Sequence, residues 1–246
     1  MSTEKIYSAT INQVLRHFRE RDREFLHLDI GSGSGDLVRL LKKEINTKSS
    51  CCDYADNLIQ LPGQPVDIVD LNKKKELPYQ DHLFDIVTAT EVIEHLEDFR
   101  AILREMYRVL KPGGICILST PNILNINSRL RNLWFGFPEL MGPLPISNRK
   151  IESCAGHISP ISIFYVMHAL YESDFQQLNV TIDKYQRSGI LKAIFLWLPI
   201  RLFGYMTWRQ EVKKYQTIDG SNKKIVKCLN SLPILLGRTI IVSATK

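Results

Sequence analysis

The sequence predicts an α/β fold with a doubly wound, mostly parallel sheet. Three observations support this prediction. Strand-like and helix-like segments alternate over the first two-thirds of the 246 residues. An apolar run at 25–30 leads through a glycine-rich turn into a run with helical spacing at 37–45. Acidic residues end the first three predicted strands, at the edge of the sheet where such folds bind their ligands.

The elements are expected in a regular order. Apolar periodicity predicts a first helix over about residues 5–20 and places later helices where apolar residues recur every three or four positions. In the helix at 99–110 these residues are Ile102, Leu103, Met106, Val109 and Leu110. The expected strands are 25–30, 50–54, 66–70, 84–89, 115–119, 178–182 and 239–244, and the further helices are 37–45, 99–110 and 159–171.

Two segments interrupt this alternation. Residues 122–158 are rich in Pro, Gly and aromatic side chains and are expected to form an irregular cap on the acceptor side. Residues 190–233 form an apolar and basic insertion before the last strand. The length fits one domain over residues 1–246, with these segments as additions to it.

Composition sets wide bounds on function. The formal net charge is +6 and the pI is near 9.0, which fits an ordinary solvated surface, an anionic membrane or a nucleic acid. The five cysteines have no metal-ligand spacing, and the first residues have no apolar core of a signal peptide. A reducing, cytoplasmic location is therefore expected, with membrane association as a further possibility.

The glycine-rich turn is the most specific motif. It reads Asp-Ile-Gly-Ser-Gly-Ser-Gly from Asp29 to Gly35, with Gly31 and Gly33 between them. The dinucleotide pattern G-x-G-x-x-G fails because Asp36 stands at its sixth position, and the phosphate-binding pattern G-x-x-x-x-G-K-[ST] is absent. The remaining pattern, D-x-G-x-G-x-G, resembles motif I of the class I S-adenosylmethionine (SAM) methyltransferases.

The resemblance continues over about half of the chain. The segments 77–87, 91–96, 108–114 and 119–122 resemble later motifs of that family, and they follow in the family's order. The resemblance implies a Rossmann-like, seven-stranded sheet whose last strand is antiparallel. It also implies SAM as the methyl donor.

The strand-end acids then receive roles from this resemblance. Asp29 would orient the glycine loop and the methionine end of SAM. Asp53, 18 residues after Gly35, would bind the ribose. Asp70 would accept a hydrogen bond from the adenine amino group, and Leu71 would pack on the adenine ring. For each acid taken alone, a role as a turn or cap residue is the alternative.

A second cluster follows the fourth strand. Glu91, Glu94 and His95 stand at i, i+3 and i+4, so one helical turn would present all three on one face and could bind a divalent ion such as magnesium. The pattern E-x-x-E-H resembles metal-assisted members of the family, and His157 is the candidate for their downstream histidine. His95 could instead remove the acceptor's proton directly. Glutamates in a first helical turn often bind nothing, which is the alternative.

The acceptor is predicted from the insertion. Residues 190–203 are the most apolar stretch, and they form either a buried helix or lid, or an element at a membrane surface. In the second case Trp197 would lie among lipid headgroups, with Lys192, Arg201 and Arg209 near anionic lipid, so that 190–209 makes a peripheral membrane contact. The expected reaction is O-methylation of a small or lipid-linked acceptor, such as a quinone precursor or a glycan.

Two alternatives remain at this stage. An RNA 2′-O-methyltransferase would suit the E-x-x-E-H pattern, but a nucleic-acid partner is not expected because no basic patch interleaved with aromatic residues is present. A non-catalytic SAM-fold binding protein is the other alternative, and the intact glycine loop and acids speak against it.

Overall fold

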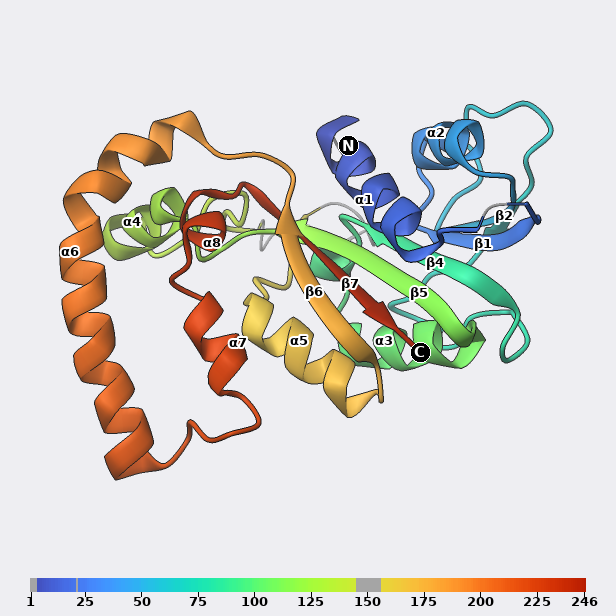
Figure 1. Ribbon diagram of the computed structural model, residues 1–246. Helices are drawn as coiled ribbons and strands as arrows, with labels where there is room; N and C mark the ends of the chain where they lie inside the picture. The colour runs from blue at the N-terminus through green and yellow to red at the C-terminus, as the bar shows by residue number, and fades with distance from the viewer. Residues whose placement is uncertain (1–3, 21, 145–155) are drawn as a thin grey trace.

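The computed structural model describes residues 4–20, 22–144 and 156–246. A seven-stranded sheet in the order β3-β2-β1-β4-β5-β7-β6 forms its centre (Figure 1). The strands are β1 (Phe25–Ile30), β2 (Thr47–Asp53), β3 (Val66–Ile68), β4 (Phe84–Thr90), β5 (Leu110–Pro121), β6 (Gln176–Ile182) and β7 (Thr239–Thr245). The α-helices are α1 (Glu4–His17), α2 (Asp36–Glu44), α3 (Phe99–Val109), α4 (Ile126–Phe135), α5 (Ile163–Glu172), α6 (Arg187–Gln210), α7 (Lys223–Cys228) and α8 (Leu232–Leu236).

The direction of the strands confirms the predicted fold class. β1 pairs in parallel with β2 and β4, β2 with β3, and β4 with β5. β7 pairs antiparallel with both β5 and β6. The chain leaves β1 toward β2 and β3 and returns on the other side of β1 at β4, so the order reverses between β1 and β4. In open α/β sheets ligands bind at the carboxyl ends of the strands beside such a reversal.

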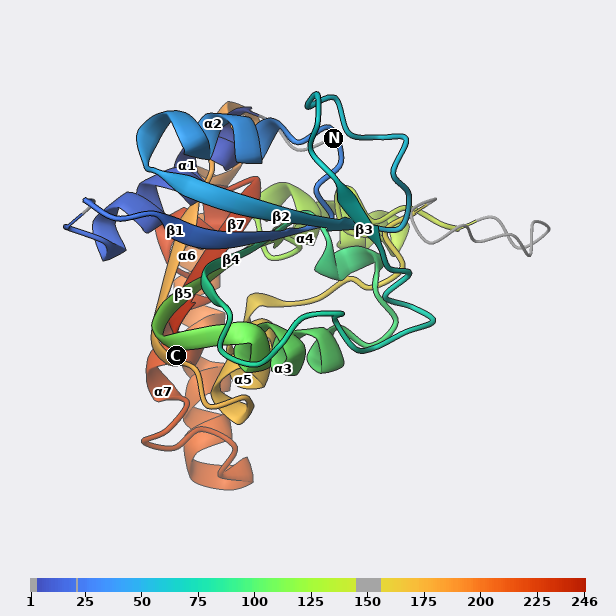
Figure 2. The same cartoon turned by 90° about the vertical axis from the view of Figure 1, so that its right-hand side faces the viewer.

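Helices cover both faces of the sheet (Figures 1 and 2). On one face, α1 and α2 bury Ile11, Val14, Leu37 and Leu41 against the apolar side chains of the strands. On the other face, the buried residues of α3 and α5 form a larger core with β4, β5 and β7. Every residue of β4 is buried, as expected for a central strand covered on both sides.

The irregular cap predicted for 122–158 is only partly correct. Its first part contains the helix α4, and residues 145–155 of the cap lie outside the described residues. The Asn125 side chain caps α4 by accepting a hydrogen bond from the Ser128 N–H group at 2.8 Å, and Gly136 ends the helix with φ of +79°. These are ordinary start and stop signals, but aromatic residues and prolines in the same segment obscured them.

Other boundaries also shift. The helix expected from Ser159 begins at Ile163 with Ser162 as its cap, while Ser159 is bound to the segment after β4. β5 begins at Leu110, because the turn at 111–114 is an irregularity within the strand. In the insertion, α6 continues through a π-helical turn, Glu211–Tyr215, and the two short helices α7 and α8 follow.

Asp85 anchors the start of β4. It is 4% exposed, and its carboxylate accepts hydrogen bonds from the Leu26 N–H group, Arg23 and Lys111, each at 2.9 Å. Burial acts to raise the pKa of Asp85, but the hydrogen bonds to these groups outweigh it and leave the pKa below its ordinary value. The ion pairs therefore join β4 to the residues before β1 and to β5.

We expect Asp85→Ala to lower the free energy of unfolding by about 2 kcal/mol, because the buried Leu26 N–H group loses its acceptor. Since the folded-state pKa is depressed, this contribution is present above a pH of about 4 and is lost as the pH falls through the folded pKa. Urea denaturation of wild type and variant between pH 7 and pH 3 measures it. A stability difference that stays constant across this range would contradict the assignment.

Candidate functional site

A cavity of about 530 Å³ opens where the sheet order reverses. This volume lies within the range of small-molecule sites. Residues from the glycine loop, the end of β2, the turn after β3 and the turn after β4 line it. They include Asp29, Gly31, Gly33, Asp53, Leu71, Asn72, Glu91, His95 and His157. The cavity lining thus brings together residues that lie up to 150 positions apart in the sequence, Tyr7 and His157.

The glycine loop passes closely over the rest of the site. Gly31 has a φ of +68°, and a Cβ atom at this position would lie 2.4 Å from the Val92 side chain. Its N–H group donates to the Cys52 carbonyl at 2.7 Å, which ties the loop to β2. Gly35 has a φ of +78°, and a Cβ atom there would lie 2.7 Å from both Ile59 and Leu61. Only glycine fits both positions.

Asp53 connects the loop to the end of β2. One carboxylate oxygen accepts from the Gly33 N–H group at 2.7 Å, and the other accepts from the Tyr54 N–H group at 2.7 Å. Each oxygen has a second lone pair for a further donor. The residue is 7% exposed and lines the cavity. The predicted ribose contact is compatible with this position, because two ribose hydroxyls could donate to these lone pairs.

Asp29 belongs to a buried polar network at the end of β1. Its carboxylate accepts a hydrogen bond from the Thr88 hydroxyl at 2.7 Å, and the same hydroxyl contacts His27 Nε2 at 2.8 Å. Burial raises the pKa of Asp29 to about 7; the Thr88 hydrogen bond opposes this effect, and the Asp53 charge adds to it. Burial lowers the pKa of His27 to about 3, so the imidazole is neutral. The Asp29 carboxyl is therefore poised to bind a cationic ligand group with release of a proton.

Of the two predicted adenine-binding residues after β3, Leu71 and Asp70, the first cavity is lined by Leu71 alone. Leu71 lines the cavity, as predicted for a residue that packs on a base. Asp70 does not line it, because its carboxylate accepts from the Asn72 N–H group at 3.1 Å and pairs with Lys73 at 2.9 Å. Asp70 is thus a turn residue here, and its contact with an adenine amino group stays a prediction.

The single helical turn predicted for Glu91, Glu94 and His95 is wrong. Glu91 has a φ of +55° and lies outside the short 3-10 helix Ile93–His95. Its N–H group donates to Ser119 Oγ at 3.1 Å, and that hydroxyl donates back to the Glu91 carboxylate at 3.4 Å. Glu91 is therefore directed toward β5, although it still lines the cavity.

Glu94, His95 and His157 form the cluster instead. One potential ligand atom from each lies within 4.8 Å of the others. Glu94 is fully buried, and neither carboxylate oxygen has a hydrogen-bond partner among the described residues. Burial, followed by the Glu91 charge, raises the pKa of Glu94 well above its usual value. A buried carboxyl group without a hydrogen-bond partner is unusual; burial favours its protonated form, and a bound cation would take the place of that proton.

Backbone carbonyls orient both imidazoles. His95 Nδ1 donates to the Gly156 carbonyl at 2.9 Å, and His157 Nδ1 donates to the Leu140 carbonyl at 2.6 Å. Since a carbonyl only accepts, Nδ1 carries a proton in each ring, and in the neutral form of the imidazole this leaves the lone pair on Nε2. The rings meet edge to face with centroids 4.8 Å apart. Metal-binding histidines are commonly oriented in this way.

His157 reaches this place because its segment is bound to the turn after β4. The Ser159 N–H group donates to the Glu94 carbonyl at 2.9 Å, and its hydroxyl donates to the Leu96 carbonyl at 2.7 Å. His157 also lines a second cavity, of about 730 Å³, between α4, the residues that follow it and the segment before α5. The walls of this second cavity are mostly apolar and include Leu124, Phe137, Met141, Leu144 and Ile158. His157 thus stands between the two cavities.

Comparisons with known proteins agree with this geometry. Residues 28–118 match the family model described as a methyltransferase domain. This part of the chain is therefore similar to a methyltransferase domain. Over 109 residues the chain is 33% identical to a ubiquinone/menaquinone biosynthesis C-methyltransferase of Desulfotalea psychrophila, and the match covers 40% of this chain and 43% of that protein. Over 108 residues the chain is 35% identical to a demethylmenaquinone methyltransferase of Listeria welshimeri, and the match covers 39% of this chain and 46% of that protein.

The chain thus spans less than half the length of these curated relatives. The fold extends further than the sequence match. A SAM-dependent methyltransferase from Archaeoglobus fulgidus superimposes with a TM-score of 0.58 at 15% identity and covers 98% of this chain and 94% of its own. Phosphoethanolamine N-methyltransferase 2 of Haemonchus contortus, solved with SAM, gives a TM-score of 0.53 at 14% identity over 97% of this chain and 52% of its own. At these identities the likeness shows the methyltransferase fold alone.

Several site residues were not found from the sequence. Thr88, in the middle of β4, holds the Asp29 carboxylate. Tyr7 of α1 lines the first cavity, and Asn72 both lines it and donates from its side chain to the His95 carbonyl at 3.0 Å. Thr88 and Tyr7 lie within regular elements, where no motif marks them. Asn72 had a usable signal, because it directly follows a predicted strand-end acid.

We expect Asp53→Asn to weaken SAM binding at least tenfold, because the amide replaces a charged acceptor of two N–H groups and turns a donor toward one of them. Isothermal titration calorimetry measures the dissociation constant. Asp56→Asn is the matched control, since it changes an exposed acid three residues away. Equal SAM affinity in wild type and Asp53→Asn would exclude Asp53 from the binding site.

The raised pKa of Asp29 predicts a pH dependence. Below pH 7 the carboxyl becomes protonated in the free protein and must lose that proton to pair with the cationic methionine end of SAM. The dissociation constant should therefore rise by up to about tenfold per pH unit below 7. Titration between pH 8 and pH 5 checks this. In Asp29→Asn the binding should be weaker and should lose this slope; an equal slope in both proteins would assign it to another group.

Proposed function

We propose that this chain methylates a hydroxyl group of a small or lipid-linked apolar acceptor, with SAM as the methyl donor. The observation that carries the proposal is the position of His157, which lines both the SAM cavity and the apolar second cavity. A methyl donor in the first cavity and an acceptor in the second would then meet beside His95 and His157. The names of the quinone-pathway relatives support an apolar ring as the acceptor.

The residues around the meeting point suit proton removal. Methyl transfer is an in-line displacement, so the protein must hold the acceptor atom behind the S–CH₃ bond and accept the acceptor's proton. Burial is the main effect that lowers the pKa of His95. The imidazole is therefore neutral at neutral pH, and its Nε2 atom can accept a proton while Nδ1 remains bound to the Gly156 carbonyl. The Gly156 and Leu140 carbonyls hold the two rings in fixed orientations.

A divalent ion fits this site. The unpaired carboxylate of Glu94 and the two Nε2 atoms of His95 and His157 form a mixed oxygen and nitrogen donor set, which suits magnesium, manganese or zinc. When bound, such an ion would lower the pKa of the acceptor hydroxyl and orient it. Glu94, His95 and His157 would hold the ion. Glu91, bound to Ser119, would remain at the edge of the site.

The metal proposal predicts that chelator abolishes turnover and that added magnesium or manganese restores it. Glu94→Gln keeps the size of the side chain but removes a ligand, so it should lower Mn²⁺ affinity at least tenfold by calorimetry and lower turnover in parallel. Glu97→Gln, at an exposed position three residues later, is the control and should bind Mn²⁺ as wild type does. Full activity in chelator would reject the metal and leave His95 as the proton acceptor.

A second candidate is methylation of a ring carbon. It is favoured by the printed name of the Desulfotalea psychrophila relative, which is a C-methyltransferase. An acceptor hydroxyl that loses its proton near His95 delivers negative charge to its ring. A ring carbon could then take the methyl group with release of S-adenosylhomocysteine and afterwards lose its own hydrogen as a proton, so the same site could serve either reaction. Transfer from SAM with a ¹³C-labelled methyl group distinguishes them, because the chemical shift of the product methyl shows whether it is bonded to oxygen or to carbon.

A further inference from the structure

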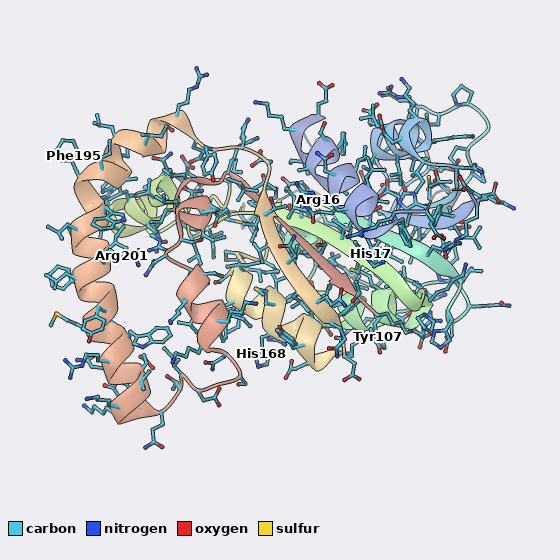
Figure 3. The ribbon with its side chains drawn as sticks, in the orientation of Figure 1. Arg16, His17, Tyr107, His168, Phe195 and Arg201 are labelled. Atoms are coloured by element: carbon cyan, nitrogen blue, oxygen red, sulfur yellow. The ribbon has the colours of Figure 1, made fainter. Side chains whose placement is uncertain are left out.

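The outward face of α6 is apolar and exposed to solvent. Side chains at helical spacing form this face, and each is more than half exposed. They are Leu191, Ile194, Phe195, Leu198, Leu202 and Tyr205. Figure 3 shows Phe195 pointing away from the body of the protein. A surface helix normally turns its apolar stripe inward and its polar residues outward, so this face is arranged for an apolar environment outside the protein.

The opposite face of α6 holds the helix against the domain. Gly189 and Ala193 are buried, and a Cβ atom on Gly189 would lie 3.2 Å from Ile126 and 3.3 Å from Leu236. Lys192 Nζ donates to the Asn127 side chain of α4 at 2.7 Å. Figure 1 shows α6 along one end of the molecule, with α4 and α8 between it and the sheet. The apolar face is therefore presented outward by a helix that is fixed to the domain.

The excess positive charge of the protein lies in the same region. Residues 187–228 contain nine Lys and Arg against two Asp and Glu, a net charge of +7. The rest of the chain has 23 basic and 24 acidic residues, a net charge of −1, so this segment accounts for the whole excess of the +6 protein. Basic residues beside an exposed apolar helix are the combination that binds anionic lipid surfaces.

The sheet excludes a membrane-spanning role for α6. The helical segment Arg187–Tyr215 is long and apolar enough to cross a membrane, and only 11% of its most apolar 18-residue stretch is buried. However, β6 precedes this helix and β7 follows it, and these two strands are hydrogen-bonded to each other from Gln176 to Ile182. A single crossing would separate them. The helices between α6 and β7 have six and five residues, too short to cross back.

We infer that α6 lies flat on an anionic membrane, with its apolar face among the lipid chains and its basic neighbours at the headgroups. Trp197 of α6 and Trp134 of α4, which are 46% and 67% exposed, would lie at the interface. If the proposed function holds, an apolar acceptor could pass from the bilayer into the second cavity, which α4 helps to line. Membrane binding itself needs neither SAM nor acceptor, so it is tested separately from catalysis.

A lipid surface fits these observations better than the other occupants of such a face. A nucleic acid would require basic and stacking side chains across the outward face, but leucine, isoleucine and phenylalanine fill its first four turns. A second copy of this chain would bring two segments of net charge +7 together. An anionic bilayer matches both the apolar face and the charge.

The tryptophans make the test direct. All three tryptophans of the chain, Trp134, Trp197 and Trp208, lie in α4 and α6. Vesicles of phosphatidylcholine with 30% phosphatidylglycerol should shift the emission of the full chain to shorter wavelength, and lipids brominated on their chains should quench it. Pure phosphatidylcholine should bind at least tenfold more weakly. No shift with anionic vesicles would overturn the inference.

Pairs of test and control variants separate the contribution of the apolar face to vesicle binding from that of the basic residues. Phe195→Ser/Leu198→Ser should weaken vesicle binding at least tenfold, whereas Tyr165→Ser/Tyr171→Ser, which removes two exposed aromatic residues of α5, should not. Lys213→Gln/Lys214→Gln should weaken it on the order of tenfold, and Lys42→Gln/Lys43→Gln in α2 should not. Equal effects of test and control pairs would contradict the assignment of the surface.

Three other results of these experiments would overturn the inference and assign the apolar face of α6 to a different partner. Resistance of the bound protein to carbonate extraction would show an integral membrane protein. A dimer in sedimentation that Phe195→Ser/Leu198→Ser dissociates, without vesicle binding, would show an interface between two copies. Binding to an RNA oligomer that survives the Phe195→Ser/Leu198→Ser change, again without vesicle binding, would show a nucleic-acid surface.

Discussion

β1 is hydrogen-bonded to β2 on one side and to β4 on the other, and the site depends on this central register. The register sets Asp29 opposite Thr88, whose hydroxyl then holds the Asp29 carboxylate. It also brings Gly31 to the Cys52 carbonyl and Gly33 to Asp53. Because all these strands are parallel, their acids and turns meet at one edge of the sheet. The reversal of strand order beside β1 leaves the space that becomes the first cavity.

The same edge separates two kinds of polar group. Asp29 and Asp53 lie on the β1 and β2 side, where backbone N–H groups and a hydroxyl stabilise them. Glu94, His95 and His157 lie on the β4 side, where the Glu94 carboxylate has no donor among the described residues. The first group suits the cationic and hydroxyl parts of a methyl donor. The second group suits a cation or an acidic methyl acceptor. Groups suited to the methyl donor and groups suited to the methyl acceptor therefore lie on opposite sides of the reversal between β1 and β4.

The sequence was sufficient to predict those parts of the fold and of the site whose residues are close together along the chain. The strand at 25–30, the glycine loop and Asp53 were found because a short apolar strand, a tight turn and a strand-end acid are adjacent along the chain. The helical turn predicted for Glu91 does not form, because the left-handed backbone of Glu91 interrupts it. His157 was placed only through the resemblance, since no local pattern predicts that hydrogen bonds from Ser159 bring its segment to Glu94. The exposure of α6 also could not be predicted, because an apolar stretch of this length can form either a buried helix or an exposed one.

A crystal structure of the protein with S-adenosylhomocysteine tests the central account most directly. The account predicts the ribose hydroxyls on the Asp53 carboxylate, the amino-acid end near Asp29 and the sulfur directed toward His95 and His157, with the second cavity open behind them. A ligand bound outside this cavity, or one whose sulfur faces away from both histidines, would contradict the account.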